Sequence, residues 1–167
     1  MSGLDHIWAG WRMPYMDRGV ERDGEGCLFC RLLESEEPEE ATYILWKSRS
    51  CFAVLNAYPY TSGHLMVMPL RHVGAPGDLT PDEVVDLWSG INDGLGALKA
   101  AYEPAGANIG ANLGRVAGAG VPGHFHMHVV PRWEGDANFM TTVAEARVLP
   151  ESLAVTWRRL TDAWRRD

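Results

Sequence analysis

The amino-acid sequence predicts an α+β fold, and three observations support this prediction. Short apolar runs typical of strands lie close together at 43–46, 51–55 and 64–69. One long stretch with helical periodicity follows them, and further strand-like runs and a second helical stretch come after it. Because the strands come in groups and do not alternate one by one with helices, we expect a mainly antiparallel sheet. A length of 167 residues favours a single domain.

The first two strand-like runs should form a hairpin. Only the four residues KSRS separate YILW (43–46) from CFAVL (51–55). The run HLMVMP (64–69) follows the turn YPYTSG and predicts a third strand, and residues 107–112 predict a fourth. The acidic stretch 31–40 is typical of a solvated helix end and turn.

The long helix should begin after Thr80 and continue to about Tyr102. Thr80 is a suitable N-cap, Pro81 suits the first helical position, and Glu83 completes a capping box. A shorter helix should open at Pro150. Apolar residues recur at helical spacing in both stretches: Val84, Leu87, Trp88, Ile91, Leu95 and Leu98 in the first, and Leu153, Trp157, Leu160 and Trp164 in the second.

Composition and charge limit the possible functions. The chain is 46% hydrophobic, as a globular protein is, and no apolar run is long enough to cross a membrane. We therefore expect a cytoplasmic protein with no membrane partner. The formal charge of −7 argues against a nucleic-acid partner, which would need a basic face. It does not exclude a nucleotide, because a few local donors can bind phosphate in an acidic protein.

Three histidines alternate with apolar residues in the segment GHFHMHVVPRW (123–133). In a strand, His124, His126 and His128 would line one face at intervals of roughly 7 Å. Phe125, Met127 and Val129 would then face the core. Two functional interpretations follow: the triad binds a metal, or it performs nucleophilic or acid–base catalysis.

The loop before the histidine strand favours catalysis. Residues 114–123 contain four glycines, which permit turned backbone conformations that expose consecutive N–H groups to an anion. A phosphate held beside an imidazole suggests covalent nucleotidyl transfer, because imidazole attacks phosphorus and the resulting phosphoramidate is labile.

The three cysteines differ in their surroundings. Cys27 and Cys30 form a C-x-x-C, which in a reducing compartment indicates a metal site or a redox pair. Cys51 lies alone within a strand-like run and is predicted to be a small buried apolar residue.

The run H-F-H-M-H-V-V resembles the signature of the histidine-triad (HIT) superfamily. Further blocks, spanning about residues 7–140, are similar to a bacterial branch resembling dinucleoside polyphosphate hydrolases and phosphorylases of the fragile-histidine-triad type. These blocks are IWAGWRMPYM, CLFC, VLNAYPYTSGHLMVMPLRHV, NLGRVAGAG and VVPRWEGDANFM. The resemblance implies one HIT-like domain over 1–167, with an N-terminal extension at 1–22, a core at about 23–140 and a C-terminal helical segment at about 141–167. It also implies a homodimer.

The resemblance assigns roles to individual residues. His126 would attack the α-phosphate and become nucleotidylated. His128 would orient the nucleophile and contact phosphate, and His64 would line the same pocket. The expected nucleotide contacts are Asn56 at the ribose, Asn112 at the phosphates or bridging oxygen, and the backbone N–H groups of Gly118, Ala119, Gly120 and Val121.

The same resemblance implies a structural metal. Its ligands would be Cys27, Cys30, His72 and His124. Two thiolates and two imidazoles suit a closed tetrahedral zinc site, and iron fits the same donors. His126 and His128 would then remain for chemistry.

The expected activity is cleavage of a nucleoside phosphate anhydride, such as a diadenosine polyphosphate, through nucleotidyl-His126. The base would lie in an apolar slot near Phe29, Ile44 and Leu55. Phosphorylase-like relatives carry a serine at about Gly120, so the acceptor stays open between water and inorganic phosphate. The alternative from another class is a nucleotide-binding or sensing module with little turnover.

Overall fold

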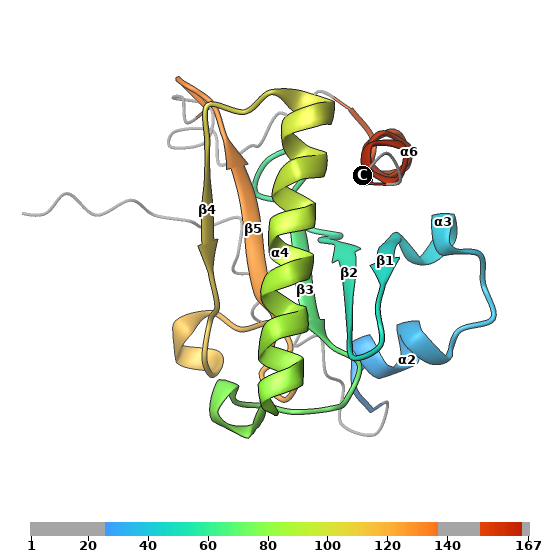
Figure 1. The fold of residues 1–167 in the computed structure, drawn as a ribbon, viewed down its shortest axis with the longest axis vertical. Coiled ribbons are helices and arrows are strands. Elements are labelled where there is room, and N and C mark those ends of the chain that lie inside the picture. Colours follow the sequence, from blue (N-terminus) through green and yellow to red (C-terminus); the bar gives the residue numbers. More distant parts are fainter. Residues whose placement is uncertain (1–25, 137–150, 165–167) are drawn as a thin grey trace, which may run out of the picture.

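The structure is a computed structural model that describes residues 26–136 and 151–164. It contains one five-stranded sheet in the order β1-β2-β3-β5-β4, and every neighbouring pair is antiparallel (Figure 1). The strands are β1 Ile44–Lys47, β2 Cys51–Leu55, β3 Leu65–Pro69, β4 Gly106–Gly110 and β5 Met127–Arg132. The predicted α+β class, the antiparallel sheet and the first hairpin are therefore confirmed.

One face of the sheet is covered by helices α4 (Pro81–Tyr102) and α6 (Leu153–Trp164). The strands and both helices share a continuous apolar core on this side. Alternation along the strands directs Cys51, Ala53 and Leu55 of β2 into that core. Its other buried members are Leu45, Leu65, Val67, Leu87, Ile91, Ala97, Leu98, Phe125, Val129, Leu160 and Ala163.

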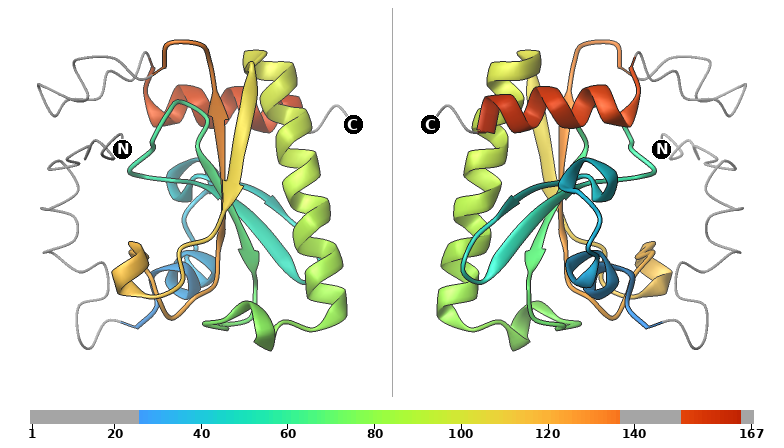
Figure 2. Two further views of the ribbon diagram at one scale, coloured as in Figure 1. Left: turned by 90° about the vertical axis from the view of Figure 1, so that its left-hand side faces the viewer. Right: turned by 90° about the vertical axis from the view of Figure 1, so that its right-hand side faces the viewer.

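The opposite face of the sheet meets α2 (Leu28–Glu34) and the loop that carries the short helix η3 (Arg115–Ala117), as Figure 2 shows from both sides. Phe52 and Val54 of β2 point to this side, where they pack with Phe29 of α2. The short helices α3 (Glu39–Thr42) and η2 (Pro76–Asp78) complete the described elements. The site described below lies on this face, away from α4.

Both predicted helices are present. Thr80 caps α4 with both halves of the capping box formed, and the helix ends at Tyr102 as expected. Helix α6 begins at Leu153, after Ser152, whose hydroxyl accepts a hydrogen bond from the N–H of Val155. Pro150 lies outside the described residues.

Two further expectations also fall outside the described ranges. These are the N-terminal extension at 1–22 and the block IWAGWRMPYM, which lies within it. Within the described ranges, no helix is long and apolar enough to cross a membrane.

The carboxylate of Glu83 joins the start of α4 to the segment after β3. Arg71 donates to both of its oxygens, at 3.0 and 2.8 Å, and the Thr80 N–H donates to Oε2 at 2.8 Å. The hydrogen-bonded Arg71 guanidinium and the Thr80 N–H together lower the pKa of Glu83 from 4.5 to about 2.

Replacing this carboxylate should therefore destabilise the fold in a pH-dependent manner. Because the pKa is lower in the folded state, the stabilisation is complete above pH 4.5 and disappears as the pH falls through about 2. Urea unfolding should show Glu83→Gln to be less stable by roughly 2 kcal/mol at pH 7, with the difference shrinking below pH 4. The control is Asp82→Asn, whose exposed side chain pairs with exposed Arg49 and should change stability little. An unchanged difference at pH 2.5 would contradict this account.

Candidate active site and metal centre

The three histidines project to one side of the segment that leads into the last strand, as the alternation predicts. Phe125 and Val129 belong to the helix-covered core, and Met127 packs against it. His124, His126 and His128 therefore project to the other face. His124 and His126 precede the first residue of β5 and are both buried.

His126 is held with one ring nitrogen available. Its Nδ1 lies 2.8 Å from the main-chain carbonyl oxygen of His124. Because a carbonyl can only accept, Nδ1 carries the proton and Nε2 keeps its lone pair. The side chain is only 5% exposed, and this burial lowers its pKa. The imidazole is therefore neutral at pH 7, which is the form that a nucleophile needs.

Phe29 of α2 contributes to that burial. Its ring meets the rings of His124 and His126 edge-on, with centroids 5.4 and 5.2 Å away. Helix α2 thus closes one side of the site.

His64 and His128 are brought next to the nucleophile. The His64 Nε2 and His128 Nδ1 atoms are 3.0 Å apart, and the rings of His126 and His128 have centroids 5.0 Å apart. His64 is fully buried at the start of β3. Gly63 precedes it at φ +82°, and a Cβ there would lie 2.7 Å from Leu98 Cδ2, so this turn requires glycine.

Asn56 lies beside His64. Its Oδ1 accepts from the Tyr58 N–H at 2.9 Å, and its Nδ2 lies 3.4 Å from His64 Nδ1. The ribose contact implied for Asn56 stays a prediction. Tyr60, which was not among the predicted site residues, also lies beside His64. Its N–H is 3.0 Å from His64 Nδ1, and its ring centroid is 4.5 Å from that of His64. The aromatic turn YPYTSG is the only sequence signal for it.

The glycine-rich loop uses part of its donor capacity internally. The N–H of Gly118 donates to Arg115 and that of Ala119 donates to Gly114, at 2.9 and 3.2 Å. Within the described ranges the N–H groups of Gly120 and Val121 make no such bond. Of the four loop N–H groups predicted to contact phosphate, two are therefore engaged within the loop, and the phosphate contacts themselves stay a prediction. Asn112 is half-buried just beyond β4, and its phosphate contact stays a prediction.

Cys27, Cys30, His72 and His124 converge from three segments of the chain. Their candidate ligand atoms all lie within 4.8 Å of one another. The Nδ1 of His124 is 3.4 Å from Cys27 Sγ and 3.8 Å from Cys30 Sγ, and the Nδ1 of His72 is 3.5 Å from Cys30 Sγ. Among the described residues this group includes neither His126 nor His128.

The ring of His124 is oriented to serve as a ligand. Its Nε2 donates to the carbonyl oxygen of Pro69 at 2.9 Å, so the lone pair is on Nδ1, which faces the sulfurs. Burial lowers the pKa of His124 and so favours the neutral ring that a metal requires. Burial and the neighbouring Cys27 raise the pKa of the Cys30 thiol to about 11. A cation at this point would stabilise the thiolate, so the donor set fits a tetrahedral metal.

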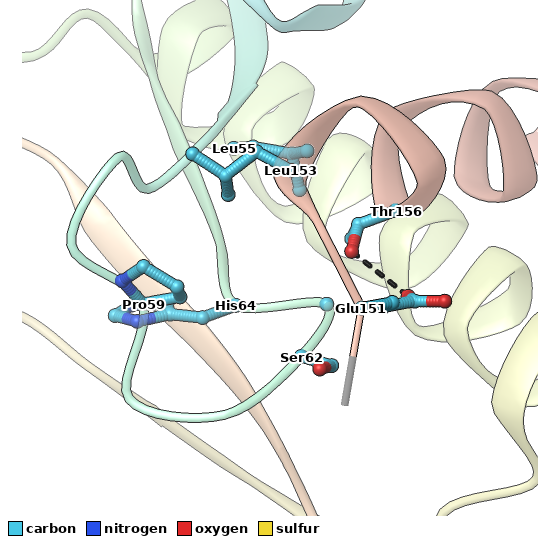
Figure 3. A pocket seen from close by; sticks show the side chains of 8 residues that line it. Leu55, Pro59, Ser62, His64, Glu151, Leu153 and Thr156 are labelled. Carbon is cyan, nitrogen blue, oxygen red and sulfur yellow. Dashed lines mark hydrogen bonds between the residues drawn. The ribbon is translucent and has the colours of Figure 1, made fainter. Parts of the chain in front are cut away.

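Cys51 is buried as predicted, and its thiol donates to the Glu83 carbonyl at 3.6 Å. The three residues predicted to form the base slot do not share one face of the sheet, and where the base binds stays a prediction. Phe29 and Ile44 pack on the site face, whereas Leu55 packs into the helix-covered core. Leu55 also lines a small cavity with Leu153, Thr156 and the site residue His64 (Figure 3).

The chain belongs to the HIT family, because the model of the HIT domain matches residues 37–135. A relative from Mycobacterium tuberculosis (strain H37Rv) named AP-4-A phosphorylase is 38% identical over 167 residues, which cover 98% of this chain and 86% of that protein. A second, from Schizosaccharomyces pombe, is named bis(5'-nucleosyl)-tetraphosphatase [asymmetrical]. It is 32% identical over 93 residues, 56% of this chain and 50% of its own length.

Solved structures confirm the fold. A zinc-bound histidine triad family protein from Mycobacterium smegmatis matches with a TM-score of 0.68 and 27% identity. The match covers 84% of this chain and 94% of that one. The family and the α+β fold expected from the sequence are therefore both confirmed.

Proposed function

We propose that this protein cleaves dinucleoside polyphosphates of the diadenosine tetraphosphate type through a nucleotidyl-His126 intermediate. The observation that carries the proposal is the hydrogen bond from His126 Nδ1 to the His124 carbonyl, which leaves Nε2 as a neutral nucleophile in a buried site. The names of the two relatives described above support the substrate class.

The first step forms a bond between His126 Nε2 and the α-phosphorus. The anhydride P–O bond breaks, and its electron pair leaves with the nucleoside polyphosphate. The His126 ring becomes cationic, and its Nδ1–H stays bonded to the His124 carbonyl, which stabilises that charge. Donors at the loop N–H groups of Gly120 and Val121 would stabilise the charge on the phosphate oxygens.

In the second step, an acceptor oxygen attacks the same phosphorus and releases His126 with its lone pair restored. We assign inorganic phosphate as the acceptor, which makes the reaction a phosphorolysis. The relative that covers nearly the whole chain supports this choice. Because Gly120 has no hydroxyl, the backbone N–H groups of this loop would bind the incoming phosphate.

Product analysis with diadenosine tetraphosphate tests the reaction. With inorganic phosphate we expect ADP and ATP. Intact-mass measurement should detect an adenylyl group on the protein, and peptide mapping should place it on a peptide that contains His126. AMP and ATP in phosphate-free buffer would identify water as the acceptor and overturn phosphorolysis. The absence of both products and adduct would overturn the enzyme proposal and favour a nucleotide-binding module.

We further propose that Cys27, Cys30, His72 and His124 bind a structural zinc ion. The zinc-bound structural neighbour supports the choice of metal. A metal at this point would tie the start of α2 to the end of β3 and to the segment before β5. It would act on structure and not on the reacting phosphate, since neither His126 nor His128 belongs to the ligand group.

We further propose that two copies associate through α4 and the edge strand β4, which is exposed along its whole length. Val85 is 71% exposed and Trp88 48% exposed on α4, and Ile109 is 40% exposed on β4. A second copy would remove these apolar surfaces from water. Sedimentation velocity should give a dimer for the wild type and a monomer for Trp88→Glu. A monomeric wild type would contradict the proposal.

A further inference from the structure

The protonation pattern of the site can be derived from its backbone contacts. His64 Nδ1 lies 3.0 Å from the N–H of Tyr60. An amide N–H can only donate, so this nitrogen of His64 must be unprotonated. Asn56 provides a second, longer donor to the same atom: its Oδ1 is occupied by the Tyr58 N–H, which turns its Nδ2 toward His64 at 3.4 Å. His64 is therefore neutral, with its proton on Nε2.

The position of the proton on His64 determines which ring nitrogen of His128 is protonated. His64 Nε2 and His128 Nδ1 are 3.0 Å apart, and only one proton can lie between them. Since His64 Nε2 carries it, His128 Nδ1 accepts, and the proton of His128 resides on Nε2.

We infer that His64 is a positioning residue that keeps His128 a hydrogen-bond donor at Nε2. The inference rests on the proposed function and deepens it. A donor at this nitrogen attracts phosphate oxygens, whereas the other neutral tautomer would present a lone pair to them and repel them. The nucleoside polyphosphate leaves as a stable anion, so a hydrogen bond from His128 suffices and no proton has to be transferred.

His126 and His128 thus carry opposite tautomers although they lie two residues apart on one face. A carbonyl oxygen, that of His124, holds the proton of His126 on Nδ1 and leaves Nε2 as the nucleophile. A backbone amide, that of Tyr60, acts through His64 and gives His128 its proton on Nε2. His126 and His128 therefore differ in function because one ring is hydrogen-bonded to a backbone acceptor and the other, through His64, to a backbone donor.

The direct test is the ¹⁵N spectrum of the imidazole rings in the wild-type, metal-loaded protein. Long-range ¹H–¹⁵N correlation distinguishes a protonated from a bare ring nitrogen without any substrate. We expect protons on Nε2 of His64 and His128 and on Nδ1 of His126. A proton on Nδ1 of His128 would overturn the inference, whatever the outcome of the product analysis.

Variants of His64 test the consequence for turnover. His64→Leu removes the donor to His128 and should lower kcat on diadenosine tetraphosphate about 10–100-fold while changing KM little. His64→Gln offers an amide donor and should recover part of that loss together with the Nε2–H signal of His128. Asn56→Ala, which leaves the Tyr60 N–H in place, should keep the tautomer of His128.

The inference fails if His64→Leu keeps both the wild-type kcat and the Nε2–H signal of His128. It also fails if the Leu and Gln variants, matched in metal content and melting temperature, lose kcat equally. In that case His64 would have only a packing role.

Discussion

His126→Ala should lower kcat on diadenosine tetraphosphate about 10,000-fold or more, because losing the nucleophile of a covalent mechanism removes the intermediate itself. The ring of His126 is buried and neutral, and its Nε2 is left unprotonated by the bond from Nδ1 to the His124 carbonyl. His64 and His128 bond to each other through their ring nitrogens, and the free nitrogen of His124 faces two thiols.

The measurement is the rate of product formation with phosphate present, together with the mass of the protein after mixing with substrate. The variant should bind the nucleotide and show no adenylyl adduct. Its melting temperature provides the control for folding. Turnover that persists in a correctly folded His126→Ala protein would place the nucleophile elsewhere.

The second large effect concerns the metal. Cys27→Ser should lose bound zinc and lower Tm by roughly 10 °C, as expected for a loss of about 4 kcal/mol in a domain of this size. The reason is the donor geometry: three chain segments meet at atoms within 4.8 Å of one another, and without a cation they gain little from that proximity.

Metal content by mass spectrometry and thermal unfolding, measured on the same preparations, check this prediction. Cys51→Ala is the matched control, because Cys51 is buried and does not belong to the ligand group. This variant should retain one zinc per chain. If zinc instead remained in Cys27→Ser and were lost on replacing His126 or His128, the triad itself would be the metal site.

Loss of the metal should also lower turnover. The ring of His124 faces the thiols, while its carbonyl holds the proton of His126. A displaced His124 therefore changes the orientation of the nucleophile. Partial activity in the metal-free protein would measure how much of that orientation the strand alone provides.

Periodicity and capping signals were enough to predict the sheet, the hairpin and both helices. Thr80, Pro81 and Glu83 are local signals, and the structure uses all three at the start of α4. The period of two in the histidine segment also predicted the right face, because Phe125 and Val129 are apolar residues that need the core.

The residues of the base slot could not be predicted, because the sequence does not show on which face of the sheet an apolar side chain lies. β1 has a register shift between Ile44 and Trp46, so its alternation is broken. Ile44 therefore faces the site although Leu45 and Trp46 both pack toward the helices. Leu55 follows the regular alternation of β2 and faces the helices as well. Only the pairing register of β1 and β2 in the structure shows which residues share a face.

The sequence also could not predict which ring nitrogen of each histidine carries the proton. It depends on the Tyr60 N–H and on the carbonyls of His124 and Pro69, and every residue of the chain has a carbonyl. Which of them lies behind a given ring is decided by the fold. The histidine pattern alone thus predicted the residues of the site but not the state of each ring.

His124 takes part in both centres at once, and this restricts what its position can tolerate. Nδ1 faces the thiols, Nε2 donates to Pro69, and the carbonyl holds His126. Asparagine or glutamine would replace at most one of the two ring functions. Experiments that seek to separate folding from chemistry should therefore alter Cys27 or His126, because a change at His124 impairs both and its effects cannot be apportioned.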